Sequence, residues 1–193
     1  NWVWNADGLK PLLGTEDDPI PKDLLTSLIN SRGANAGLFF FRQLLLASFG
    51  QALHPNKGRG DFLIPFPNLS KKGIGFDPPP GPFMPASFGH LAGGYDARYY
   101  SYLGGEVFRA DMFESGFQSA KEGGCLSKSV GKDFRGKIFQ PGGFKDAGDM
   151  LKDFFGREPK DRAFFKLLNI PPGTVCLSFG IFFLSKNARG VFF

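Results

Sequence analysis

The sequence contains little cysteine and little histidine, with two of each among its 193 residues. Cys125 and Cys176 lie far apart and form no C-x-x-C pair, which argues against a disulfide framework and favours a reducing compartment. The two histidines, His54 and His90, share no metal-ligand spacing with these cysteines, and the chain contains no H-E-x-x-H motif. We therefore expect no metal site built from these residues alone.

Long blocks of one charge and long apolar runs are also missing. The formal net charge is +5, but the basic residues are scattered among acidic ones, and Lys71-Lys72 is one of few adjacent basic pairs. The apolar run over 175–184 has about half the length that a membrane-spanning helix needs. No signal peptide opens the chain. We therefore expect no nucleic-acid partner, no membrane partner and a cytoplasmic location.

Phenylalanine, in contrast, is abundant, with 24 copies that argue for a folded core and against disorder. The stretch 34–54 is so apolar around its whole axis that it predicts a helix buried on most sides. Residues 55–87 are rich in Pro and Gly and predict a long irregular connection with short helical turns. The sequence thus predicts a mainly α fold with a short strand over 174–184 and helices over 17–32, 34–54, 96–120, 144–156 and 158–170.

All four tyrosines of the chain lie within eight positions, directly after a glycine-rich turn that carries His90. If Asp96 caps a helix, Tyr99 and Tyr102 share one face of it. Phenol and imidazole groups donate hydrogen bonds that suit a developing oxyanion. The alternative is that these tyrosines pack in the interior with satisfied hydroxyls, and that the histidine is structural.

The run MPASFGHLAGGYDARYYSYL, residues 84–103, resembles the C-terminal portion of zinc metallo-oligopeptidases of the thimet oligopeptidase and neurolysin type. Other stretches resemble the same family in the same order, among them EVFRADMF and PGGFKDAGDMLKDFFGREPKDRAF. The resemblance implies that residues 1–169 form the C-terminal part of the catalytic domain, a bundle-like helical part of a channel-bearing peptidase. Residues 170–193 do not resemble the family and are expected to form an atypical tail.

The resemblance also implies roles for individual residues. By matching position, Tyr102 is expected to stabilise the oxyanion and Tyr95 to assist it. His90 and Tyr99 are expected to hold the substrate backbone. The glycine-rich loop is expected to adapt to different peptides through two residues, Gly93 and Gly94.

The family holds zinc with an H-E-x-x-H helix, which the resemblance places before Asn1. We therefore expect this chain to be the substrate-binding part of a zinc metalloendopeptidase that hydrolyses short peptides. Its partner would be the remaining N-terminal part of the peptidase, and the chain alone would be inactive because hydrolysis needs the metal-activated water. The alternative is a truncated or diverged product that binds peptides or a protein without cleaving them.

Overall fold

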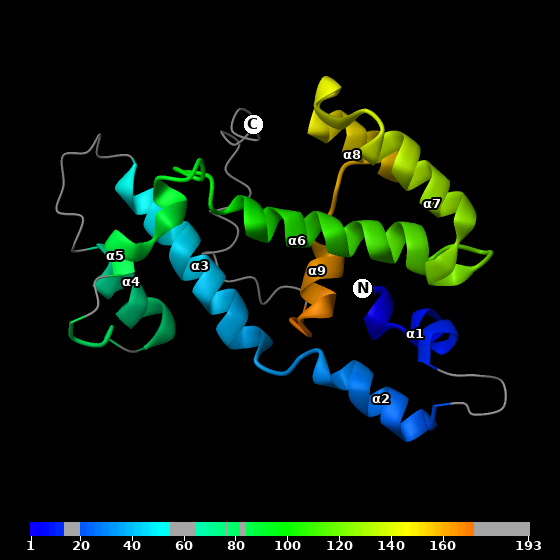
Figure 1. Cartoon of the computed structure of the whole chain (residues 1–193), viewed down its shortest axis with the longest axis horizontal. Helices are drawn as coiled ribbons and strands as arrows, with labels where there is room; N and C mark the ends of the chain where they lie inside the picture. Colours follow the sequence, from blue (N-terminus) through cyan, green and yellow to red (C-terminus); the bar gives the residue numbers. More distant parts are fainter. Residues whose placement is uncertain (14–19, 55–64, 76, 82–83, 172–193) are drawn as a thin grey trace. The chain divides into compact units, whose positions relative to one another are not determined.

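The computed structural model describes residues 1–13, 20–54, 65–75, 77–81 and 84–171. These residues form helices and turns without a strand, which confirms the mainly α prediction (Figure 1). The strand predicted over 174–184 and nearly all of the predicted tail lie outside the described residues. The chain divides into two compact units: unit 1 comprises Asn1–Gly33 and Val107–Phe193, and unit 2 comprises Ala34–Glu106.

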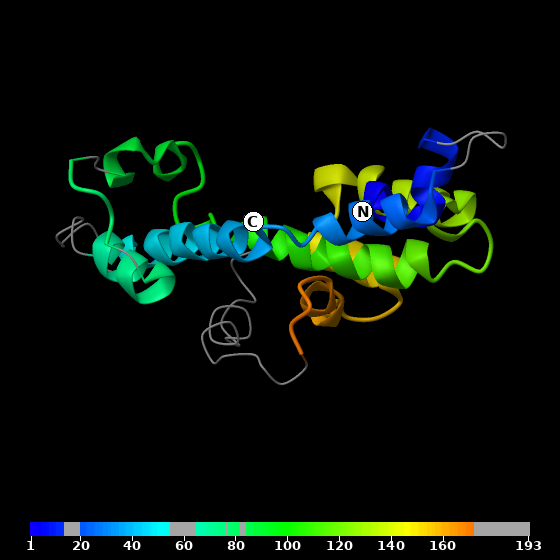
Figure 2. The same ribbon diagram turned by 90° about the horizontal axis from the view of Figure 1, so that it is seen from below.

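Unit 2 is built around α3 (Ala36–Leu53), with α4 (Pro65–Ile74) packed beside it (Figures 1 and 2). The side chain of Phe49 is fully buried, and its ring centroid lies 5.5 Å from that of Phe66 and 6.5 Å from that of Phe88. Phe49 therefore holds both α4 and the segment after α5 (Met84–Ser87) against α3. Both α4 and α5 lie within the stretch for which the sequence predicts an irregular connection.

The prediction that α3 is buried on most sides is wrong for its N-terminal half. Burial is confined to the C-terminal half, where α4 and the Phe88 segment cover residues from Leu46 to Gly50. Leu38, Phe39 and Phe41 are 67%, 55% and 46% exposed, because no described residue of unit 2 covers that half. By length and composition the stretch Lys22–Leu53 could cross a membrane, a test that core helices of soluble proteins also meet. Its helical backbone is interrupted at Asn35, whose φ of 60° is left-handed.

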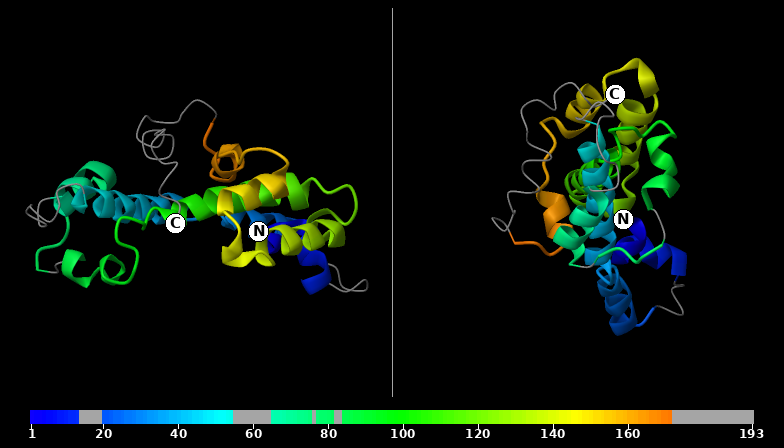
Figure 3. Two further views of the ribbon diagram at one scale, coloured as in Figure 1. Left: turned by 90° about the horizontal axis from the view of Figure 1, so that it is seen from above. Right: turned by 90° about the vertical axis from the view of Figure 1, so that its left-hand side faces the viewer.

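Unit 1 contains α1 (Ala6–Leu13), α2 (Lys22–Ser31), α7 (Lys128–Phe134), α8 (Ala147–Phe155) and α9 (Arg162–Leu167). Two π-helical segments follow α6 (Ser101–Met112) and α7, and the second of them packs against α8 (Figure 3). The indole Nε1 of Trp2 donates to the carbonyl of Cys125 at 2.5 Å, and its ring packs edge-on against Phe113 and Phe117. These contacts fix the N-terminal segment within unit 1.

The ends of α8 follow from its sequence. Asp146 caps the N-terminus by accepting a hydrogen bond from the backbone of Asp149 at 3.1 Å. Gly156 ends the helix with φ 66°, a left-handed conformation that favours glycine, as the sequence predicts. The next helix, α9, begins at Arg162 rather than at residue 158 as predicted, so Pro159 lies before the helix.

A buried ion pair ties α6 to the segment after α8. Asp111, only 3% exposed, accepts hydrogen bonds from both terminal guanidinium nitrogens of Arg157, at 2.8 and 2.6 Å. It also accepts from the backbone N–H of Lys160 at 2.7 Å. The hydrogen bond from Arg157 to Asp111 raises the pKa of the guanidinium above its ordinary value, so Arg157 stays positively charged at physiological pH.

Replacing Asp111 with Ala should lower the free energy of unfolding by about 2–3 kcal/mol, because the Arg157 guanidinium and the Lys160 amide both lose their acceptor. Urea denaturation of the 193-residue chain measures this change. Asp133→Ala is the matched control, because Asp133 pairs with Lys137 at an exposed site and should contribute less than about 1 kcal/mol. Equal effects of the two substitutions would show that the Asp111 pair does not stabilise the fold.

Candidate functional site

The backbone that carries the tyrosines differs from its sequence-based prediction. The helix α6 begins at Ser101, so Asp96 does not cap it. Ala97 has φ 56°, which an α-helix cannot contain, and the chain instead makes a tight turn over residues 97–100. In this turn the amide of Ser101 donates to the carbonyl of Arg98 at 2.9 Å, and that of Tyr102 donates to Tyr99 at 3.3 Å. The turn still brings residues three apart onto one side of the chain.

The glycine-rich segment folds back on itself before Tyr95. Gly94 has φ 86°, which side chains disfavour, and a Cβ at Gly93 would lie 3.1 Å from the carbonyl oxygen of Gly89. The reversal allows the amide of Tyr95 to donate to the carbonyl of His90 at 3.2 Å. The two glycines thereby place Tyr95 beside His90.

Four of the predicted site residues form one cluster of rings. The His90 ring centroid lies 5.5 Å from that of Tyr95, 5.0 Å from that of Tyr99 and 5.9 Å from that of Tyr102. Tyr95 and Tyr102 stack on each other at 5.1 Å, and Tyr99 lies 5.0 Å from Tyr102. The structure thus gathers an imidazole and three phenols from a stretch of 13 residues.

The three phenols have different surroundings. The Tyr99 side chain is only 6% exposed, and its hydroxyl donates to Oε1 of Gln43 on α3 at 3.0 Å. Tyr95 and Tyr102 are 37% and 42% exposed, so their hydroxyls are accessible. A hydrogen bond to Tyr95 raises the pKa of Tyr102 above its ordinary value, with smaller contributions from desolvation and from the neighbouring phenols. Tyr102 therefore stays protonated, and able to donate a hydrogen bond, at neutral pH.

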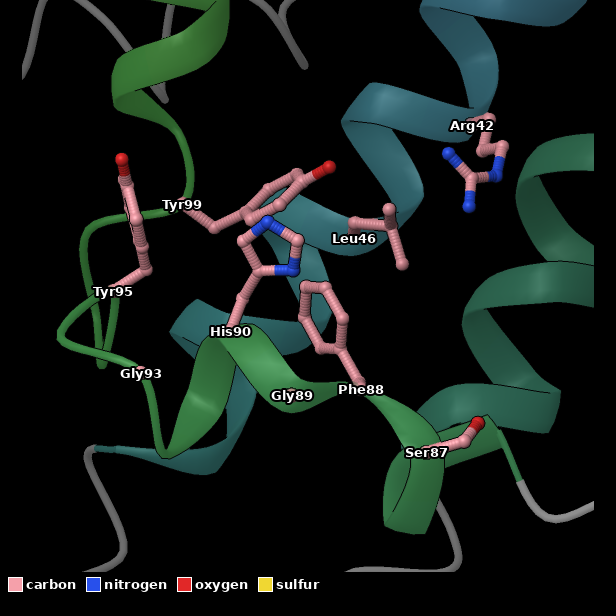
Figure 4. Close-up of a pocket in the computed structure, with 9 residues that line it drawn as sticks. All are labelled: Arg42, Leu46, Ser87, Phe88, Gly89, His90, Gly93, Tyr95 and Tyr99. Atoms are coloured by element: carbon pink, nitrogen blue, oxygen red, sulfur yellow. The ribbon is translucent and has the colours of Figure 1, made fainter.

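A cavity of about 560 Å³ adjoins this cluster (Figure 4). Nine residues line it: Arg42, Leu46, Ser87, Phe88, Gly89, His90, Gly93, Tyr95 and Tyr99. Three residues of α3 at the site were not expected from the sequence, namely Arg42, Leu46 and the Tyr99 acceptor Gln43. Arg42 and Gln43 are adjacent polar residues in an otherwise apolar stretch, and this interruption is the sequence signal that could have identified them.

The described residues do not fit a metal ion. No group of three or more His, Cys, Asp or Glu side chains among them could hold one. Nδ1 of His54 lies 2.6 Å from the carbonyl of Gly50 within its own helix, and His90 is surrounded by rings. The polar groups of the ring cluster are an imidazole and three phenols, which can donate hydrogen bonds.

Replacing Tyr95 with Phe should lower the pKa of Tyr102 toward its ordinary value, because the hydrogen bond that Tyr102 donates to Tyr95 is the largest cause of the upward shift. NMR titration of ring-labelled tyrosine measures this change. The Tyr100→Phe variant is the control and should leave the titration of Tyr102 unchanged. An unchanged pKa of Tyr102 in Tyr95→Phe would show that the two hydroxyls do not interact.

Comparison with known proteins identifies the family to which the chain is similar. Residues 1–170 match the family model described as Peptidase family M3. The chain is 32% identical over 175 residues to a thimet-like oligopeptidase of Dictyostelium discoideum, covering 88% of this chain and 25% of the relative. It is 35% identical over 167 residues to oligopeptidase A of Escherichia coli, covering 83% of this chain and 24% of the relative. It is 34% identical over 185 residues to saccharolysin of Saccharomyces cerevisiae, covering 88% of this chain and 24% of the relative. The chain spans about a quarter of the length of these relatives, and it belongs to peptidase family M3.

Proposed function

We propose that this chain is the substrate-binding C-terminal part of a zinc metalloendopeptidase that hydrolyses short peptides. The observation that carries the proposal is the ring cluster of His90, Tyr95, Tyr99 and Tyr102 beside a cavity, in a chain of peptidase family M3. Hydrolysis of a peptide bond places negative charge on the carbonyl oxygen, and preorganised donors stabilise that charge. Accessible phenols that are protonated at neutral pH are suitable donors.

Tyr102 is accessible and protonated at neutral pH, and on binding it donates to the oxyanion the phenol hydrogen that otherwise goes to Tyr95. Tyr95 assists as a second accessible phenol, which stacks on Tyr102. The oxygen of Tyr99, which donates to Gln43, remains an acceptor for a backbone N–H of the peptide. His90 also lines the cavity and binds the peptide backbone there.

The glycine-rich loop allows peptides of different sequence to bind. Gly93 lines the cavity without a side chain, and Gly94 allows the sharp reversal next to it. Backbone with few side chains presents carbonyl and amide groups that recognise any peptide, whatever its sequence.

Peptidases of this family are generally zinc-dependent, and we assign the zinc ligands to the part of the parent enzyme that this chain does not include. We propose that the same missing part of the parent enzyme covers the N-terminal half of α3. Three large apolar side chains there, those of Leu38, Phe39 and Phe41, are exposed, and the chain amounts to about a quarter of its relatives. An apolar surface of this kind is normally covered by another part of the protein.

The cytoplasm is the compartment that we propose for the protein. Cys125 is buried and forms no disulfide with a described residue, and burial raises the pKa of its thiol above the ordinary value. A protonated, inaccessible thiol suits a reducing compartment.

A second candidate function is peptide or protein binding without cleavage. It is favoured by one observation, the lack of a metal-ligand set among the described residues. The ring cluster would then bind a peptide through the same hydroxyls.

The ligand for this test is a peptide analogue that carries a phosphinate in place of the scissile amide. Replacing Tyr102 with Phe should weaken its binding about tenfold, because the phosphinate oxygen loses a charge-assisted hydrogen bond. Binding of the parent peptide, which carries no such charge, should change little. Calorimetric titration of the 193-residue chain measures both affinities. Tyr100→Phe is the control and should leave both unchanged, whereas equal losses for the two ligands in Tyr102→Phe would assign Tyr102 a purely structural role.

The purified 193-residue chain should contain no stoichiometric zinc and should not hydrolyse a quenched fluorescent peptide, because the part of it that the structure describes has no set of residues that could hold a metal and activate water. Elemental analysis and a fluorescence assay measure the two properties. Stoichiometric zinc together with turnover would contradict the assignment of the metal ligands to the remainder of the enzyme. Saturable binding without turnover in an intact natural protein would favour the second candidate.

A further inference from the structure

Arg42 is the one residue with a permanent charge among those that line the cavity. It is exposed on α3, and no aspartate or glutamate lines the cavity with it. Among the described residues it makes neither a hydrogen bond nor an ion pair. By contrast, Lys71 on α4 is paired with Asp77 at 3.2 Å. The cavity therefore carries an unneutralised positive charge on one of its walls.

Two hydroxyl groups of the lining already donate hydrogen bonds within the protein. The hydroxyl of Ser87 donates to the carbonyl of Met84 at 3.0 Å, and that of Tyr99 donates to Gln43. Figure 4 shows the Arg42 guanidinium at the opposite end of the labelled group from Tyr95, with the apolar side chain of Leu46 between them. A ligand that reaches from the phenols to Arg42 must therefore pass the apolar side chain of Leu46. Because a guanidinium only donates hydrogen bonds, the end of the ligand at Arg42 must be a group that accepts them.

We propose that Arg42 binds a carboxylate of the peptide that occupies this cavity, an inference that rests on the proposed function. The planar guanidinium presents two parallel N–H donors that match the two oxygens of a carboxylate. A peptide supplies that group as its C-terminal carboxylate or as an Asp or Glu side chain. In either case Arg42 selects peptides whose carboxylate lies at a fixed distance from the bond held at the phenols.

The test compares two forms of one labelled peptide without acidic side chains, the C-terminal acid and the C-terminal amide. Fluorescence anisotropy at low ionic strength gives the dissociation constant of each for the 193-residue chain. We expect the acid to bind about fivefold more tightly than the amide, because Arg42 is exposed and its ion pair is partly screened by solvent. Arg42→Gln should remove this preference without weakening binding of the amide.

Lys72→Gln is the matched control, because Lys72 is exposed on the same unit, carries the same charge and does not line the cavity. It should preserve the fivefold preference. A third peptide, an amide with a glutamate as its last residue, distinguishes the two sources of the carboxylate. If this peptide binds as tightly as the acid, and Arg42→Gln weakens it, a side-chain carboxylate also occupies the site.

Equal affinity of wild-type chain for the acid, the amide and the glutamate amide would overturn the role of Arg42 while leaving the proposed function in place. A preference for the acid that persists in Arg42→Gln would also overturn it. The absence of binding for every peptide would overturn both the role of Arg42 and the proposed function.

Discussion

The buried phenol of Tyr99 determines the geometry of the rest of the site. Its hydroxyl donates to Gln43, which fastens the segment 88–100 to α3. Its ring contacts Phe88, His90 and Tyr102, each with a centroid distance of 5.0 Å. Because the glycine-rich loop has little side-chain volume of its own, this single anchored ring determines where the more exposed groups lie. The same ring connects the cluster to the core of unit 2, since Phe88 also packs against the buried Phe49.

The sequence predicts which residues gather at the site but not how the backbone brings them together. The spacing of Tyr99 and Tyr102 predicts a shared face, and this holds although the helix begins only at Ser101. A tight turn with bonds between residues three apart produces nearly the same placement as a first helical turn. The left-handed residue responsible, Ala97, carries no signal in the sequence because alanine favours helices. Asp96 favours the N-cap position of a helix, but the left-handed Ala97 that follows it prevents a helix from starting there.

Partners from distant parts of the chain could not be predicted, because no periodicity connects them. Gln43 and Tyr99 are 56 positions apart, and Asp111 and Arg157 are 46 apart. In each pair, one partner is a polar residue among apolar neighbours on a helix, Gln43 on α3 and Asp111 on α6, and the sequence does show this. The exposure of the first half of α3 could not be predicted for a different reason. An apolar composition predicts that a helix is buried, but it does not say which part of the protein covers the helix. The half that remains uncovered belongs to a chain that spans about a quarter of its relatives.

The two units carry different chromophores. Both tryptophans, Trp2 and Trp4, belong to unit 1, whereas all four tyrosines belong to unit 2. Near-ultraviolet absorption by phenol groups thus originates wholly in unit 2, and indole emission originates wholly in unit 1. A thermal melt followed at both signals reports on the two units separately without any added dye, and coincidence of the two curves would show that they unfold as one cooperative body.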